Sequence, residues 1–439
     1  MTITSSLNAG VAGLNANATR LATISDNIAN SSTFGYKRAT TDFESMVIGN
    51  SRGAGKYSAG GVRASSHRLI DERGGIVGTA NALDLAVSGR GMLPVMPSVK
   101  LSDDGIGTQA MMMTTTGSFR MDEDGVVKTQ SGLVLLGWPA NVNGDIPTQP
   151  RNSMSGLRPV VIDANQTAAD PTTQVSLGVN LPATDTYVGA DGTPIPLSVE
   201  YYSNLGTTET LSISFTPSVP VAPATAPSNA WSMVIRDSAS NGAVVGEYAL
   251  QFDATRGAGG TLASVTGVTG GPYDAATGTV EVNVAGGPIN MALGRPGLPG
   301  GLTQLADNFV PAAVTRNGAP TGTLTAVEVD ENGYILATYD TGFIRRIYQI
   351  PLVDVPNVNG LTPLGDQTFQ VSPQSGGFLL WDAGDGPTGS VMGFAREGSA
   401  TDVAAELTAL ITTQRAYSSN AKVIQTVDEM LQETTNIKR

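Results

Sequence analysis

Apolar residues recur every seven positions at both ends of this chain. Near the start, the repeating positions are Leu7, Leu14, Leu21 and Ile28, with Val11 and Ala18 between them. Near the end, they are Val403, Leu410, Tyr417, Ile424 and Leu431, with Leu407 and Ala421 between them. This spacing is that of the a and d positions of a coiled-coil seam. The pattern therefore predicts two terminal helices, each with an apolar face that needs a partner.

The partner of each apolar face is not determined by the periodicity. The two helices can pair with each other, or both can be ordinary core helices packed on a globular body. Their remaining faces are small and polar, as at Asn15, Thr19, Thr412 and Ser418. Such faces would also allow each helix to pack against copies of itself.

Composition limits the classes of function. The 439 residues are enough for two or three domains. Thirty-eight acidic and 25 basic residues give a net charge of −13, which argues against nucleic-acid binding. Without cysteine the chain has neither disulfides nor thiol chemistry. No apolar run reaches the roughly 18 residues of a membrane span, and no apolar segment typical of a cleaved signal follows Met1, so we expect no membrane insertion.

The region between the helices predicts a β-rich body. Its 53 Gly and 25 Pro residues, counted over the whole chain, together with many Thr, Val and Ser residues, favour short strands and tight turns. The predicted fold is mainly β with terminal α-helices, in nested discontinuous domains with paired N- and C-terminal coiled-coil-like helices and two outer β domains. The expected divisions are a helical domain (1–30 and 399–439), an extended connector (31–70 and 392–398), a β domain (71–150 and 303–391) and an inserted outer β domain (151–302).

Patterns that would indicate catalysis or ligand binding have simpler interpretations. Residues 384–389 match G-x-G-x-x-G, but Pro387 interrupts them and no helix follows, which favours a turn. Residues 122–125 and 330–333 resemble the start of a calcium loop, but the glutamate required at its twelfth position is missing, so we expect hairpin turns. His67 is the single histidine. We therefore predict no catalytic residue, no cofactor and no metal site.

An aromatic and basic cluster surrounds the predicted turn at residues 340–342. Its members Arg345, Arg346 and Tyr348 are candidate contacts between subunits, because an arginine-rich tip on an acidic chain suits an intersubunit ion pair. A tip that is simply solvated explains the same residues equally well.

Both ends of the chain resemble the axial proteins of the bacterial flagellum. Residues 6–14 (SLNAGVAGL), 24–30 (ISDNIAN) and 35–37 (GYK) are similar to the opening of rod and hook subunits. Residues 406–411, 414–417, 420–424 and 428–431 resemble the closing signature of the same family. Residues 301–305 (GLTQL) and 347–357 (IYQIPLVDVPN) resemble hook subunits in particular. One departure is Pro94, which argues against strand pairing after residues 89–91.

The resemblance implies a structural protein rather than an enzyme. A hook subunit would self-assemble into a curved, flexible, hollow tube that transmits torque from rod to filament and through which later subunits are exported. The helical domain would then be the inner polymerisation domain, with the heptad residues as its polymerisation seam. Implied partners are copies of the chain itself, the rod, the hook cap, the hook–filament junction proteins and the flagellar type III export apparatus.

The implied location is extracellular, in the hook attached to the basal body, after export without a cleaved signal peptide. Two other classes stay open. The nearer is a distal rod subunit of the basal body, although the inserted domain is longer than rod subunits usually carry. The more distant is an extracellular β-rich adhesin or enzyme.

Overall fold

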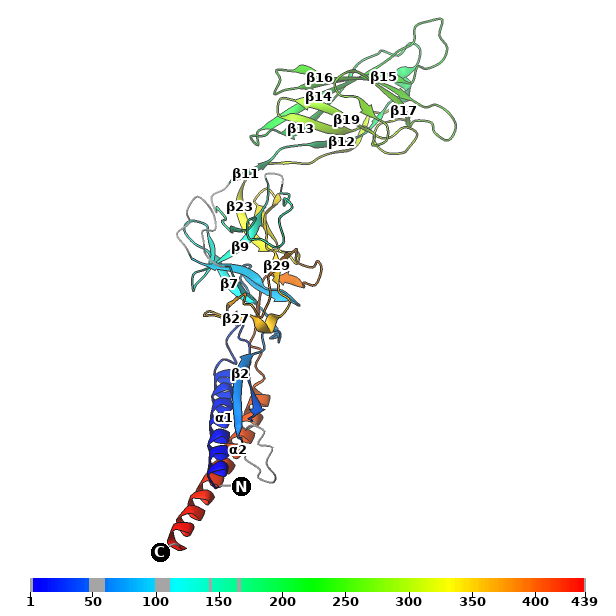
Figure 1. Ribbon diagram of the computed structural model, residues 1–439. Helices are drawn as coiled ribbons and strands as arrows, with labels where there is room; N and C mark the ends of the chain where they lie inside the picture. Colours follow the sequence, from blue (N-terminus) through cyan, green and yellow to red (C-terminus); the bar gives the residue numbers. More distant parts are fainter. Residues whose placement is uncertain (1–2, 47–59, 99–110, 142–143, 164–166, 438–439) are drawn as a thin grey trace. The chain divides into compact units, whose positions relative to one another are not determined.

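The structure is a computed structural model that describes residues 3–46, 60–98, 111–141, 144–163 and 167–437 (Figure 1). It is mainly β with one long helix at each end, so the predicted fold class is confirmed. Contacts divide the chain into two compact units. Unit 1 comprises Met1–Ala164, Val327–Ala337 and Arg345–Arg439, and unit 2 comprises Asn165–Ala326 and Thr338–Ile344.

The terminal helices belong to unit 1 and pack against each other. Helix α1 spans Ile3–Ala29, and helix α2 spans Val403–Ile437. The side chain of Asp402 caps α2, accepting hydrogen bonds from the backbone N–H groups of Ala404 (2.9 Å) and Ala405 (3.2 Å). The helices run antiparallel, since the start of α1 meets the distal part of α2 and its end meets Glu406. Figure 1 shows the pair in blue and red.

The segment that follows α1 forms a two-stranded ribbon beside the helix (Figure 1). Strands β1 (Ala39–Ser45) and β2 (Val62–Arg68) pair antiparallel, from Ala39 opposite Arg68 to Ser45 opposite Val62. Both strands contact α1. Part of the segment expected to be an extended connector is therefore regular strand in the structure.

The β body of unit 1 consists of short strands around an apolar core. Leu136, Trp138, Leu157 and Leu380 are among the side chains buried there. The strands are β3 (Ile76–Gly78), β4 (Asp84–Ser88), β5 (Leu93–Pro97), β6 (Met112–Thr114), β7 (Thr116–Met121), β8 (Val127–Thr129), β9 (Leu133–Pro139), β10 (Arg158–Pro159), β26 (Leu352–Asp354), β27 (Thr362–Pro363), β28 (Phe369–Gln370), β29 (Leu379–Trp381), β30 (Ser390–Met392) and β31 (Ala395–Glu397). A short 3₁₀ turn, η2 (Val358–Gly360), precedes β27.

Two of the expected turns are confirmed, and one expectation about a strand is wrong. Residues 122–125 connect β7 to β8 as a hairpin, in which Gly125 N–H donates to Asp122 O (3.0 Å). Residues 330–333 form the same kind of turn. Pro94, however, lies inside β5, opposite Met113 of β6. Strand β9 pairs with β5 only from Val95 onward, so the missing N–H of Pro94 removes no bond on that side.

Unit 2 consists of two sheets that share one core. One sheet has the order β13-β14-β15-β16-β17, and the other has the order β18-β19-β20-β12-β21, with β22 also on β12. Along β12 and β15 exposed and buried side chains alternate, as expected for strands with one face on a core. Trp231, Tyr248 and Met291 lie together in this core. The core also contains Leu302, and Phe309 and Val314 pack against it, so chain beyond residue 302 belongs to unit 2.

The strands of unit 2 are β11 (Thr167–Asp170), β12 (Gln174–Leu181), β13 (Ile195–Tyr202), β14 (Thr208–Pro217), β15 (Ala230–Asp237), β16 (Ala243–Phe252), β17 (Leu262–Thr269), β18 (Tyr273–Asp274), β19 (Thr279–Val284), β20 (Gly287–Ala292), β21 (Thr303–Gln304) and β22 (Val310–Arg316), with the 3₁₀ turn η1 (Ala183–Thr186). Strands β23 (Ala319–Val329), β24 (Tyr334–Tyr339) and β25 (Ile344–Gln349) carry residues of both units.

Candidate assembly site: the helix pair and its joint

Small residues form the face of α1 that meets α2. A Cβ atom added to Gly10 would lie 3.1 Å from Ile424 Cγ1, and one added to Gly13 would lie 3.1 Å from the side-chain amide of Asn420. Asn17 is buried on the same face and donates from Nδ2 to Gly13 O (2.7 Å). Because the distance between packed helices depends on the side chains at the contact, the two glycines allow a close approach.

The apolar seam predicted from the sequence is only partly buried within one chain. Ile424 is the seam residue that touches Gly10, and Leu410 is half-buried. Leu7, Leu14, Leu21 and Ile28 are also half-buried, and Ala18 and Ala421 are exposed. The large seam residues that remain exposed are Val11 (42%), Val403 (40%), Leu407 (46%), Tyr417 (41%) and Leu431 (38%). The helices therefore leave much of their large apolar surface uncovered within one chain.

Sequence analysis missed the roles of Gly10 and Gly13. Glycine is a poor helix former, so two glycines three positions apart within a predicted helix are a signal in themselves. Glycine destabilises a helix, but it occurs in helices where another backbone or side chain must come close. That argument would have identified the face that meets α2.

A buried ion pair connects the two terminal segments where they enter the β body. Lys37 Nζ lies 2.7 Å from Glu397 Oε1, and neither side chain is more than 1% exposed. Lys37 also donates to Glu72 O (2.7 Å), and Gly74 N–H donates to Glu397 Oε1 (2.8 Å). Removing one partner of a buried pair costs about 3–5 kcal/mol, because the other charge is left uncompensated. We call this region, formed by residues 26–27, 35–39, 72–74, 397 and 406, the joint.

The joint contains a second cation close to the same carboxylate. Arg73 Nη1 lies 3.7 Å from Glu397 Oε2, and Arg73 Nη2 donates to Gly91 O (2.9 Å). Burial lowers the pKa of Lys37, while the charge of Glu397 acts in the opposite direction. Burial likewise lowers the pKa of Arg73. The pKa values of Lys37 and Arg73 are lowered for the same reason. A charged side chain that is removed from water loses its hydration and is stabilised only by nearby protein groups.

Asn27 holds the end of α1 to the joint by several hydrogen bonds. Its Nδ2 donates to Ala39 O (2.8 Å) and to Glu406 Oε1 (3.1 Å), while its Oδ1 accepts from Ala39 N–H (2.9 Å). The hydroxyl of Tyr36 donates to Asp26 Oδ2 (2.9 Å), and burial together with Asp26 raises the pKa of Tyr36 to about 12. The joint thus fixes the end of α1 and, through Glu406, the first turn of α2.

Gly35 explains part of the motif at residues 35–37. Its φ of +73° lies in the left-handed region, and a Cβ atom there would come within 2.8 Å of Thr116 Cγ2. Sequence analysis used this motif for resemblance but assigned no contacts to it. The signal available was a Tyr-Lys-Arg run inside a Gly/Ser-rich segment.

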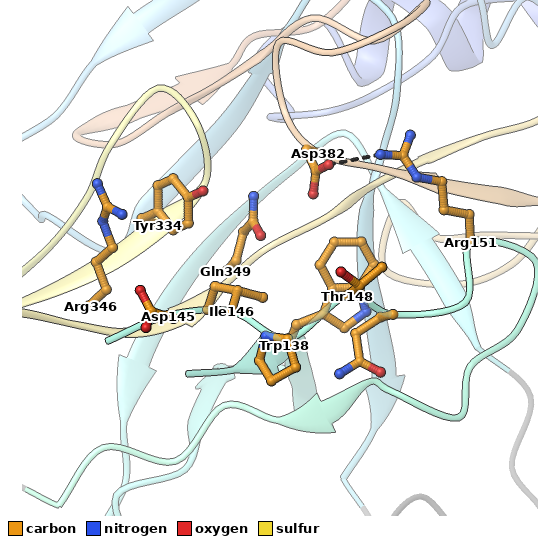
Figure 2. Close-up of a pocket in the computed structure, with 11 residues that line it drawn as sticks. Trp138, Asp145, Ile146, Thr148, Arg151, Tyr334, Arg346, Gln349 and Asp382 are labelled. Carbon is orange, nitrogen blue, oxygen red and sulfur yellow. Dashed lines mark hydrogen bonds and ion pairs between the residues drawn. The ribbon is translucent and has the colours of Figure 1, made fainter. Parts of the chain in front are cut away.

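Of the three candidate contact residues, Arg346 lines a cavity of about 390 Å³ in unit 1. Figure 2 shows Arg346 and Tyr334 on its wall, with the guanidinium 4.5 Å from the ring centroid. On the opposite wall Arg151 bonds Asp382 (3.0 Å). Arg345 and Tyr348 are half-buried, and burial raises the pKa of Tyr348. The cavity was not foreseen from the sequence, because Trp138, Asp145 and Arg151 come from a separate segment.

Neither the joint nor the cavity has the composition of a metal centre. Within the described ranges no group of three or more Asp, Glu or His side chains is placed to hold a metal ion. Among the described helices none is long and apolar enough to cross a membrane.

Comparisons with known proteins give matches along the whole chain. A family model described as flagella basal body rod protein matches residues 7–37, and one described as flagellar basal body rod FlgEFG protein C-terminal matches residues 393–437. The chain is 32% identical to the flagellar hook protein FlgE of Brucella suis biovar 1 over 443 residues, covering 100% of both chains. It is 29% identical to that of Escherichia coli K12, covering 98% of each.

Among solved structures, the chain is similar to the Helicobacter pylori flagellar hook protein FlgE2. The identity is 13% and the TM-score 0.47, and the alignment covers 74% of this chain and 99% of the other.

Proposed function

This chain belongs to the flagellar hook protein FlgE family and is therefore a structural subunit of the flagellar hook, and we propose that its copies join through the apolar seam of α1 and α2. The match over the full length favours a hook subunit over a distal rod subunit. The proposed polymer is a curved, flexible, hollow tube. It transmits torque from rod to filament, and later subunits pass through it.

One observation carries this proposal. The two helices meet through small residues, whereas Val11, Leu407 and Leu431 remain exposed on them. Burying one Leu side chain contributes about 1.5–3 kcal/mol, so a row of uncovered large residues favours association with another surface. Because the subunit assembles with copies of itself, we expect this row to pack against the same row on a neighbouring copy.

The joint gives the proposed tube a way to carry load. A helical layer that holds the polymer together must be connected to the β body, or torque on one would not reach the other. The buried ion pair joins Lys37 of the N-terminal segment to Glu397 in strand β31 of that body, and Asn27 joins the end of α1 to Glu406 of α2. Buried, hydrogen-bonded charges have a defined geometry, which suits a connection under force.

Both ends of the chain match models described for rod proteins, and this supports contact with the rod. A helical layer shared by rod and hook subunits would continue from one into the other. The proposed partners are copies of the chain, the rod, the hook cap, the hook–filament junction proteins and the flagellar type III export apparatus. The proposed location is the extracellular hook. The four-part domain division, with 1–30 and 399–439 innermost, is part of the same proposal.

The seam can be tested by placing a charge on an exposed helix position. Leu407→Asp and Val11→Asp should leave the folded subunit intact, since both side chains are exposed, but should prevent tube formation because a buried carboxylate is costly. Leu205→Asp, at an exposed leucine of unit 2, is the matched control and should assemble normally. Electron microscopy of purified material distinguishes these outcomes. If Leu407→Asp forms tubes of normal appearance, the proposal that copies join through the apolar seam is wrong.

A further inference from the structure

The cavity of unit 1 contains a buried polar side chain that the fold itself does not use. Gln349 lines this cavity and is only 4% exposed. It lies opposite Trp138 in the pairing of β25 with β9, so the two side chains share one face, and Trp138 belongs to the apolar core. The amide of Gln349 makes no side-chain hydrogen bond with any residue that the structure describes. A buried amide without a partner lowers stability, so glutamine at this position needs a reason other than folding.

The charged side chains around the cavity balance one another. On one wall Arg151 pairs with Asp382 (3.0 Å), and Arg346 and Asp145 lie on the other (Figure 2). Two guanidinium groups and two carboxylates leave the walls without net charge. The chain as a whole carries a charge of −13 and therefore repels anions. A neutral ligand enters such a cavity at the least electrostatic cost.

Both guanidinium groups are held in place by aromatic rings. Arg346 lies 4.5 Å from the ring centroid of Tyr334, and Arg151 lies 4.8 Å from that of Trp381. Groups that are already fixed lose less freedom when a ligand binds, which favours binding.

The polar groups of the cavity include both donors and acceptors of hydrogen bonds. A guanidinium only donates, and an ionised carboxylate only accepts. The amide of Gln349 and the hydroxyl of Thr148, which also lines the cavity, can do both. A ligand that matches this set must itself donate and accept at several neighbouring positions. Hydroxyl groups have that property, since each has one donor and two acceptor lone pairs.

We propose that this cavity binds a neutral polyhydroxylated molecule, such as a single sugar residue, with Gln349 as its central hydrogen-bonding group. The ligand supplies the partner that the buried amide lacks. The volume of about 390 Å³ is near the small end of the range for ligand sites, which suits one sugar ring rather than a long chain. The site lies within one chain, so it does not depend on how copies assemble.

Saturation-transfer NMR on the dilute, full-length subunit tests this site, with glucose, galactose and N-acetylglucosamine as probes. At least one of these sugars should bind to the unmodified chain. Gln349→Leu keeps a side chain of similar size but removes the amide, so it should raise the dissociation constant about five- to tenfold. The Tm of this variant should be unchanged or higher, because no buried amide is left unpaired. Gln374→Leu, at an exposed glutamine of unit 1, is the matched control and should bind as the unmodified chain does.

A second variant avoids the core altogether. Arg346→Gln alters an exposed side chain, so it should fold normally but bind the sugar several-fold more weakly. Arg345→Gln, at the neighbouring arginine that does not line the cavity, should bind as the unmodified chain does. Acetate is the anionic probe. Binding of none of the three sugars, binding of acetate alone, or unchanged sugar binding in both Gln349→Leu and Arg346→Gln would each overturn the proposal.

Discussion

Large apolar side chains are exposed on the helix pair but buried in unit 2, whose two packed sheets we call the sandwich. In unit 2, residues such as Phe215, Trp231 and Met291 are buried between two sheets of the same chain. On α1 and α2 the close contact falls to Gly10 and Gly13, while Leu407 and Tyr417 remain exposed. The sandwich carries its own stabilising core. The helix pair has a large part of its apolar surface still to bury, and so its stability should depend on neighbouring copies.

The largest expected effect comes from separating the helix pair from the β body at the joint. Lys37→Met removes the cation 2.7 Å from Glu397 and leaves Arg73, 3.7 Å away, as the remaining one, so it should destabilise unit 1 by about 3 kcal/mol, the lower end for a broken buried pair. Adding Glu397→Leu removes the buried carboxylate but leaves Arg73 without its partner, so the double variant should recover only part of that loss. Chemical denaturation of the three proteins measures the free energies. If the double variant is no more stable than Lys37→Met, the ion pair is not the source of the effect.

A matched control for the joint is available nearby. Glu72 pairs with Arg38 (3.0 Å), but both side chains are about one third exposed. Exposed pairs contribute roughly 0–1 kcal/mol, so Glu72→Gln should change stability little. A loss as large as that of Lys37→Met would mean that exposure does not govern these pairs.

A second, smaller effect tests the comparison directly in dilute, unassembled subunits. Backbone amides of α1 and α2 should exchange with solvent about a hundredfold faster than those of β14 and β15, because the helices lack a large buried apolar core. In assembled tubes the helical amides should become protected while those of unit 2 change little. Hydrogen–deuterium exchange with mass spectrometry measures both states. Equal protection of helices and sandwich in the dilute subunit would contradict the comparison.

Parts of this fold were predictable because the signals are local. Heptad spacing located both helices, and an Asp-Gly turn between apolar runs located the hairpin at residues 122–125. The face on which α1 meets α2 was not predicted, since a search for large apolar residues passes over Gly10 and Gly13. Pro94 was misjudged because its cost depends on which partner strand lies beside it.

The joint was beyond sequence reasoning for a different reason. Lys37 lies 360 positions before Glu397 and Arg38 lies 368 positions before Glu406, and no periodicity relates them. Only the folded structure shows that Lys37 pairs with Glu397 and that Arg38 pairs with Glu406. The motif at residues 35–37 indicated kinship, but the three-dimensional structure was needed to give each of its residues a contact.

The smallest expected effect concerns acid and one carboxylate of unit 2. Asp237 is buried, and its oxygens accept hydrogen bonds from Tyr201 (2.6 Å) and Ser240 (2.6 Å). Burial alone would raise its pKa, but the hydrogen bonds outweigh burial, and the pKa of Asp237 is lowered. A carboxyl whose pKa is lower in the folded state adds stability above its unfolded pKa of about 3.9.

That stability is lost as the pH falls from about 4 through the lowered pKa of Asp237, because the folded state must then accept a proton it binds weakly. The free energy of unfolding of unit 2 should therefore decline over this range, and Asp237→Asn should reduce the slope of the decline. The Asn variant loses the charged acceptor, so it should be less stable than the unmodified chain at neutral pH while the difference narrows in acid. Thermal unfolding followed at several pH values, with the signal of Trp231 reporting on the sandwich, gives both quantities. An unchanged slope in Asp237→Asn would assign the acid sensitivity to other carboxyl groups and would leave the self-contained core of unit 2 as its main source of stability at every pH.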